Sequence, residues 1–220
     1  QDLIPLFAVL RGAIHGTTFG REDRTDPQFS LPEDQFVYRV RSGLRWGGRE
    51  PVMIPDLAME MSAWYEGAFR THPGRYGYHG DREIEPASHQ LWGRALLAYT
   101  FPELNHSFGI TITGGGSVAV DRYSAFRLGG NLPLYSEFPL SMPGYYFQEL
   151  SASAFVLTGV SYGVPLDHRH CWRADVLGTA AFVDYLPTLE QPRNWNKGLG
   201  GGLSYRSPSG AWQVAVAYGY

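Results

Sequence analysis

The sequence lacks any apolar run that approaches the roughly 20 residues required by a transmembrane helix, which excludes a helical membrane protein. It contains one cysteine, Cys171, so an intrachain disulfide and a cysteine-based metal cluster are also excluded. We expect Cys171 to be a packed or surface thiol. Charge is sparse as well. Charged residues make up 18% of the 220 positions, and the net charge of −3 gives no indication of a nucleic-acid partner.

Aromatic residues and glycine are abundant instead, and apolar and polar residues alternate along much of the chain. The segment QFVYRVRSGLRW (35–46) is an example. Its large apolar residues fall on one parity, and its three arginines, Arg39, Arg41 and Arg45, fall on the other. A period of two residues indicates a β-strand with one apolar face and one basic face.

Similar segments recur along the whole chain, and no amphipathic helical segment of three turns interrupts them. The alternation predicts an all-β, antiparallel protein with about ten strands. These strands cover residues 5–14, 35–46, 57–70, 89–101, 107–120, 125–130, 150–165, 171–186, 195–206 and 211–220. Long connections rich in charge, proline and glycine, such as 20–34 and 70–88, alternate with short turns such as 206–210 over part of the chain.

The length and polar faces of these strands favour a transmembrane β-barrel over a soluble sandwich. Strands of about ten to fourteen residues exceed the 5–6 typical of soluble sheets and are long enough to cross a bilayer at a tilt. If the second and third strands form a hairpin, Arg39, Arg41 and Arg45 face the same side as Glu60 and Glu66. We therefore expect ion pairs across these strands and a charged wall that lines a wet lumen.

Aromatic residues near the strand ends fit the girdles at the two surfaces of a membrane. They are Trp46, Trp64, Tyr99, Phe101, Tyr205, Trp212, Tyr218 and Tyr220, of which Trp64 has the parity of the polar face. Alternation also places Gly198, Gly200 and Gly202 of GLGGGLSY (198–205) on the inward face and Gly201 on the outward face. Inward glycines either leave room for a loop or plug inside the barrel or relieve the curvature of its wall, and both interpretations stay open. In 150–165, Ala152 and Ala154 share the outward parity of Val156.

Three C-terminal segments resemble the barrel of the bacterial surface antigen family: FRLGG (126–130), MPGYYFQELSASAFVLTGVSYGVPL (142–166) and GLGGGLSYRSPSGAWQVAVAYGY (198–220). This superfamily contains outer-membrane assembly factors, two-partner-secretion transporters and barrels fused to patatin-like lipases. The closing hairpin is the most specific part of the resemblance. The motif positions are Gly129, Gly130, Pro143, Gly144, Tyr145, Glu149, Gly200, Gly202, Pro208 and Gly210.

The resemblance implies that residues 1–220 form a single β-barrel domain in the bacterial outer membrane. The domain is then either a barrel of about ten strands or part of one of about 12 to 16 strands, with terminal strands and any N-terminal soluble domain missing. The family has a loop arginine before the glycine that corresponds to Gly144, and that arginine pairs with acidic residues in the lumen. Pro143 stands there in this chain and cannot form a charge-assisted bond, so Arg39 or Arg41 of the wall is the expected substitute.

The function implied by the resemblance is non-catalytic: translocation or insertion of a polypeptide, or membrane anchoring. The expected partners are the lipid bilayer and either a polypeptide substrate or other subunits of an outer-membrane complex. One alternative is a structural or pore-forming barrel subunit of a larger complex. A second alternative, from a different class, is a barrel hydrolase that acts on lipid.

Candidate catalytic and metal-binding residues are few. His106 and Ser107 are adjacent, and adjacent residues of a strand point to opposite faces, so His106 is badly placed to activate Ser107. His168 and His170 would share a strand face, but no third ligand of evident register accompanies them. We therefore predict no catalytic residue, no metal ligand and no cofactor. Three further charged residues are either lumen ion pairs or loop residues: Asp121, Arg122 and Asp184.

Overall fold

The computed structural model describes residues 5–48, 57–130, 140–169, 171–187, 189–207 and 213–219, and within them the chain is all-β. The strands are β1 (Leu6–Thr17), β2 (Phe29–Ser30), β3 (Gln35–Gly48), β4 (Leu57–Arg70), β5 (Gly74–Tyr78), β6 (Arg82–Ile84), β7 (Ala87–Thr100), β8 (Ser107–Val118), β9 (Phe126–Leu128), β10 (Leu150–Pro165), β11 (Trp172–Tyr185), β12 (Trp195–Arg206) and β13 (Gln213–Gly219). Across these ranges, no helix is long and apolar enough to cross a membrane.

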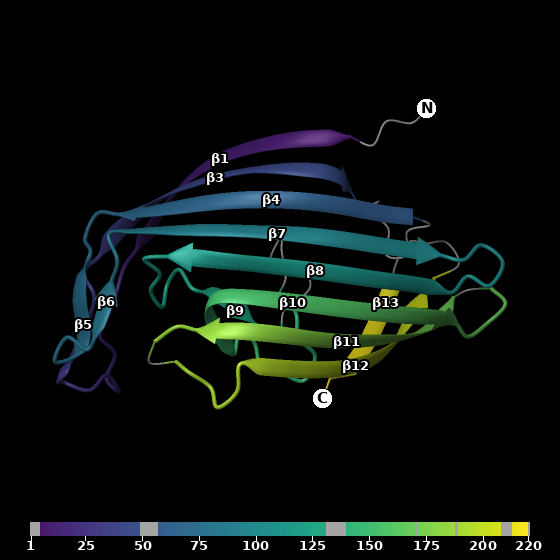
Figure 1. Cartoon of the computed structure of the whole chain (residues 1–220). Coiled ribbons are helices and arrows are strands. Elements are labelled where there is room, and N and C mark those ends of the chain that lie inside the picture. Colours follow the sequence, from purple (N-terminus) through teal and green to yellow (C-terminus); the bar gives the residue numbers. More distant parts are fainter. Residues whose placement is uncertain are drawn as a thin grey trace.

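Ten strands form one large antiparallel sheet in the order β1-β3-β4-β7-β8-β10-β11-β12-β13, with β9 paired to the start of β10. The predictions of an all-β antiparallel fold and of these ten strand segments are confirmed. Figure 1 shows that the sheet curves from β1 at the top to β12 at the bottom, with β13 turned behind it. In the described part of the chain β1 pairs only with β3 and β13 only with β12, so a closed barrel is not observed.

A small second sheet, β2-β5-β6, forms within segments 20–34 and 70–88, which their charge, proline and glycine content predicts to be loops. Its strands have two to five residues, too few for alternation to be recognised. Aromatic contacts hold it together. The ring of Phe29 lies edge-on to Tyr78 at 5.3 Å and to Tyr76 at 6.4 Å. The small sheet projects from one end of the large sheet, at the left in Figure 1.

The connections at the two ends of the large sheet differ in length. Consecutive links of an antiparallel meander lie at opposite ends of its strands. The end that carries the small sheet has the connections 18–34, 71–86, 119–149 and 186–194, whereas the opposite end has 49–56, 101–106, 166–171 and 207–212. The predicted alternation of long and short connections therefore holds for the whole meander.

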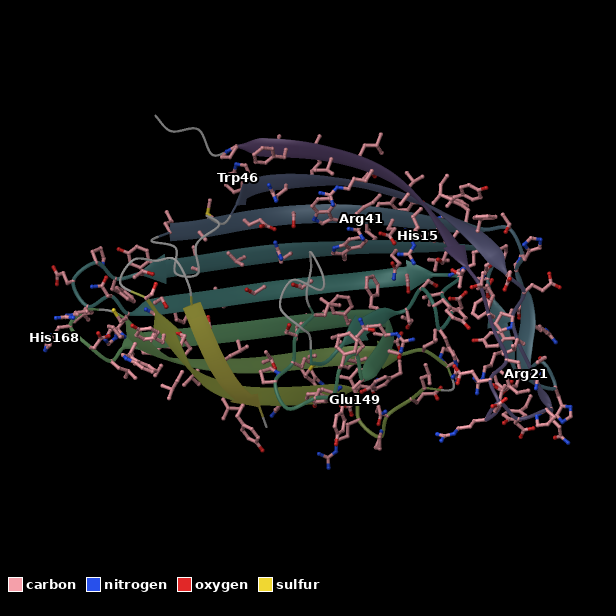
Figure 2. All side chains as sticks on the ribbon, turned by 180° about the vertical axis from the view of Figure 1, so that it is seen from behind. His15, Arg21, Arg41, Trp46, Glu149 and His168 are labelled. Atoms are coloured by element: carbon pink, nitrogen blue, oxygen red, sulfur yellow. The ribbon has the colours of Figure 1, made fainter. Side chains whose placement is uncertain are left out.

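The two faces of the large sheet differ in chemistry. We define the inner face as the one covered by β9 and residues 140–149, and the sheet curves around them (Figure 2). On β3 the outer face carries Phe36 and Leu44, whose side chains are 55% and 56% exposed. Other large apolar side chains exposed on the outer face include Leu10, Ile14, Leu57, Met61, Leu91, Leu97, Ile112, Val156, Val160, Val176, Phe182 and Leu199. The outer face is thus rich in exposed apolar side chains, whereas the concave inner face carries the polar side chains of the same strands.

The inner face has an apolar cluster where the sheet contacts β9 and residues 140–149. The rings of Trp64 and Trp92 are stacked with centroids 6.5 Å apart, and Phe126 of β9 contacts Phe155 at 4.9 Å. Leu128, Leu140, Met142, Leu150, Ala152, Leu157, Ala181, Val183 and Tyr185 complete the cluster. Trp64, with an exposed fraction of 2%, is therefore an interior residue, and its interpretation as a girdle residue is wrong.

Candidate functional site on the inner face of the sheet

The centre of the inner face is an ion pair between neighbouring strands. Arg41 on β3 stands directly opposite Glu66 on β4, and its Nε donates to Oε2 of Glu66 at 2.7 Å. Nη2 of Arg41 lies at the same distance from that oxygen, and Nη1 of Arg39 lies 3.8 Å from Oε1. The prediction that these two arginines share a face with Glu66 and pair with it across the strands is confirmed.

The charged wall predicted from the sequence does not include the partner of Glu60, which is Arg94. Nη2 and Nε of Arg94, on β7, donate to Oε1 of Glu60 at 2.6 and 3.0 Å, and Ser62 Oγ donates to the same oxygen at 3.2 Å. The Glu60 side chain is 3% exposed, so its charge is enclosed and compensated locally. The parity of Arg94 in the segment HQLWGRALLAY could have indicated this position, because it shares its face with Trp92 rather than with Leu91 and Leu97.

Arg45 has the parity of Arg39 and Arg41 on β3, but among the described residues it is not ion-paired with Glu60 or Glu66. Its register partners are Phe7 on β1 and Ser62 on β4, so no carboxylate stands directly opposite. Its guanidinium lies over the ring of Phe7, with the carbon 5.0 Å from the ring centroid, and its buried Nε has no hydrogen-bond partner. A cation–π contact with the neighbouring strand therefore replaces the expected ion pair.

Residues 140–149 fold back onto the end of β9 through backbone hydrogen bonds. Gly129 N donates to Leu140 O at 3.1 Å, and Gly130 N donates to Tyr146 O at 2.9 Å. Gly129 has φ of +139°, and a Cβ there would lie 2.5 Å from Tyr146 O, while a Cβ on Gly130 would lie 2.7 Å from Tyr145 O. Both motif glycines are therefore required by the close approach of this segment.

The tip of this segment lies on the glycines of β12. A Cβ on Gly200 would lie 2.9 Å from Cβ of Pro143, and one on Gly198 would collide with the Pro143 carbonyl oxygen. Tyr145 Oη donates to Asn196 Oδ1 at 3.4 Å. Of the two interpretations of the inward glycines, room for an inserted segment is the one observed. Pro143 makes this contact through its ring and carbonyl, whereas Arg39 and Arg41 pair with Glu66 on the wall.

The other motif positions do not take part in the contact between Pro143 and β12. Gly144 has φ of +85°, as expected for glycine in a tight turn, and Glu149 accepts a hydrogen bond from Tyr146 N at 2.8 Å. Gly202 lies further along β12, opposite Asp175. Pro208 and Gly210 lie outside the described residues. The structure therefore brings Gly129, Gly130, Pro143, Tyr145 and Gly200 together, although they are spread over more than 70 positions of the sequence.

Asp121 belongs to a buried ion pair at the loop side of the wall. Asp121 Oδ2 lies 3.1 Å from Nη1 of Arg70, the last residue of β4, and both side chains are 3% exposed. The same carboxylate accepts hydrogen bonds from Glu85 N and Tyr123 N at 3.0 and 2.9 Å. Asp121 is thus a loop residue that is also ion-paired. Arg122 offers its carbonyl to Arg127.

The pKa of Tyr123, next to this pair, is raised above its ordinary value. Burial, followed by the neighbouring Tyr76 and then Asp121, raises the pKa of Tyr123 to about 12. Its ring contacts Phe19 edge-on at 5.8 Å, and its centroid lies 6.0 Å from that of Tyr76. Tyr123 thus links the connection after β8 to the small sheet.

The two residues considered for hydrolysis, His106 and Ser107, do not come together. His106 Nδ1 is hydrogen-bonded to Tyr162 Oη at 2.6 Å on the outer face, whereas Ser107 accepts a hydrogen bond from Arg173. The expectation that they point to opposite sides is confirmed. Over the described ranges no group of three histidine, cysteine or acidic side chains is arranged to hold a metal ion. Asp184 is exposed on the outer face, and His170 lies outside the described residues.

No protein-family model matches the sequence, and no curated protein matches it.

Proposed function

We propose that this protein is an outer-membrane β-barrel that translocates, inserts or anchors a polypeptide, with residues 140–149 as a movable segment inside it. The observation that supports the proposal most is the inverted chemistry of the large sheet. Its exposed face is apolar, whereas its enclosed face holds the Arg41–Glu66 and Arg94–Glu60 pairs. A bilayer outside and a hydrated interior satisfy both faces.

Loop lengths support the same proposal. Outer-membrane barrels have short periplasmic turns and longer extracellular loops. The connections at one end of this meander are likewise longer than those at the other end. In a bilayer the free edges of β1 and β13 need partners, because an unpaired backbone group in hydrocarbon costs several kcal/mol. We expect these edges to close on each other or on further strands of the same assembly.

The inserted segment supports a role in handling a polypeptide. It occupies the side of the interior formed by β10 to β12. Its contacts are backbone hydrogen bonds to Gly129 and Gly130, the packing of Leu140 and Met142 in the inner apolar cluster, and the Pro143 contact with two glycines. Displacing it would open that side of the interior without breaking an ion pair of the wall. The motif resemblance to a family of polypeptide-handling barrels points to the same role.

A disulfide tether tests this proposal. The substitutions Pro143→Cys and Gly200→Cys, with Cys171→Ser, place two thiols where a Cβ at position 200 would lie 2.9 Å from the Cβ of residue 143. A shift of about 1 Å gives the separation of about 3.8 Å found in a disulfide. We expect the wild-type protein to float with phosphatidylcholine vesicles and to give fluctuating conductance in planar bilayers. The oxidised variant should insert equally well but give no conductance, and reduction should restore the fluctuating conductance.

Two results would count against the proposal. A chain that stays monodisperse without detergent and does not float with vesicles would contradict the membrane assignment. Equal conductance of the oxidised and reduced variant would contradict the movable segment.

A second candidate function is a pore-forming subunit of a larger outer-membrane complex. It is favoured by the wall formed by β3 and β4, where the side chains of Arg39 and Arg41 remain 42% and 28% exposed on the inner face. Under this alternative the oxidised variant would show a steady conductance rather than none.

A further inference from the structure

Lys197 is the single lysine of the chain, and it stands on the outer face of the sheet. It alternates with the buried residues Asn196 and Gly198 on β12 and is flanked on its own face by Trp195 and Leu199. In the described strands of the large sheet, the other charged side chain on this face is Asp184, one residue from the end of β11. An isolated charge on a lipid-facing wall is unfavourable at depth and is accommodated near the interface.

Lys197 borders a shallow groove of about 600 Å³ on this face. Two cross-strand rows form it: Thr158, Ala180 and Lys197 in one, and Val160, Gly178 and Leu199 in the other. The floor consists of the small residues of β11, since a Cβ on Gly178 would meet nothing within 4 Å. The groove is open along its length, so a ligand seated in it would remain in contact with the surroundings on one side.

Aromatic residues close the groove at its loop end. Phe182 and Trp195 are register partners in the next row, with centroids 5.4 Å apart, and Trp195 is 64% exposed. Lys197 is two residues from Trp195, roughly 7 Å along the strand. A lysine stem can extend by about that distance and bring its ammonium group to the headgroup level that the tryptophan marks.

We propose that this groove binds one acyl chain of an anionic glycerophospholipid, whose phosphate pairs with the Lys197 ammonium group. The inference rests on the proposed function, because it requires the outer face to meet lipid. The floor is one strand wide, which suits a single extended chain, and one ammonium group matches a single phosphodiester. These features favour a glycerophospholipid over a glycolipid with several chains and two phosphates.

The single lysine provides a direct readout. The full chain is reconstituted in vesicles of phosphatidylcholine alone or with phosphatidylglycerol of identical chains, and the rate at which an amine-reactive reagent labels Lys197 is followed by peptide mass spectrometry. We expect the labelling rate to fall about fivefold when phosphatidylglycerol is present. Native mass spectrometry should show one phosphatidylglycerol retained by the wild type and none by Lys197→Gln.

Two glycine variants separate the groove from general attraction to an anionic surface. Gly178→Leu fills the floor and leaves Lys197 in place, so we expect it to abolish the protection. Gly12→Leu adds the same side chain to the outer face of β1, where a Cβ also meets nothing within 4 Å, and should retain it. Protection that persists in Gly178→Leu would overturn the proposal, and stronger protection by lipid A would overturn the assignment to a glycerophospholipid.

The two proposals fail differently in this experiment. A chain that does not insert into phosphatidylcholine vesicles contradicts the membrane function itself. A chain that inserts but shows equal labelling of Lys197 in both vesicle types contradicts only the lipid site.

Discussion

Arg41 and Glu66 stand directly opposite each other on β3 and β4, with Nε and Oε2 2.7 Å apart on the enclosed face of the sheet. The Glu66 side chain is 10% exposed, so its charge depends on the guanidinium beside it. The pair therefore shows how this fold accommodates charge on the inner side of a wall whose other side is apolar.

Removal of Arg41 should destabilise the protein because it leaves the Glu66 carboxylate with only the more distant Arg39. We expect Arg41→Ala to lower the free energy of unfolding by about 1–3 kcal/mol, measured by urea titration in detergent micelles. Arg75→Ala is the matched control, since the Arg75–Glu83 pair is 3.9 Å long with side chains 75% and 57% exposed. It should change stability by less than about 0.5 kcal/mol. Equal effects of both variants would contradict the enclosed character of the inner face.

A side chain at Gly198 should displace the inserted segment, because its Cβ would collide with the Pro143 carbonyl. We expect Gly198→Ala to destabilise the protein by about 1–3 kcal/mol and to increase protease cleavage within residues 140–149. Gly178→Ala adds the same methyl group on β11, where it meets nothing, and should leave the cleavage pattern unchanged. An unchanged pattern in Gly198→Ala as well would show that the segment does not pack on β12.

Loss of the Asp121 charge should release the connection after β8. Asp121→Asn leaves Arg70 buried without its carboxylate, and we expect a loss of about 3–5 kcal/mol, or local opening that relieves it. Faster amide hydrogen exchange at Tyr123 and Ser124, whose N–H groups bond to Asp121, would report that opening. Asp184→Asn, at an exposed carboxylate, is the control and should have little effect.

The attachment of the small sheet should depend on alkaline pH through Tyr123. The pKa of Tyr123 is about 12 in the folded chain, above the value near 10 expected when unfolded. Its contribution to stability is then fully present below pH 10 and is lost as the pH rises through 12. We expect residues 71–86 to become more sensitive to an alkaline protease between pH 10 and 12. Tyr123→Phe should lack this step, and an identical step in that variant would assign it to another group.

Some features of the fold could be predicted from local pattern alone. A period of two residues is visible within any strand of ten or more residues, and it indicated the long strands of the large sheet and the sides of Arg41 and Glu66. The three-residue strand β9 is too short to show the same alternation. Strict alternation fails in β10 because a bulge shifts the register between Ala152 and Ala154. The shift turns Ala152 inward, where it is 0% exposed. Strict alternation predicted it to face outward.

The amino-acid sequence by itself determined that this chain forms long amphipathic strands, because strand geometry sends successive side chains to opposite faces whatever the rest of the molecule does. Only the tertiary structure decided which charges meet, since Arg94 pairs with Glu60 from a strand that comes later in the chain and Arg45 lies over the ring of Phe7. It also decided that Pro143 lies on the glycines of β12. Such contacts depend on the curvature of the sheet and on the path of one long connection, neither of which leaves a periodic signal in the residues that make them.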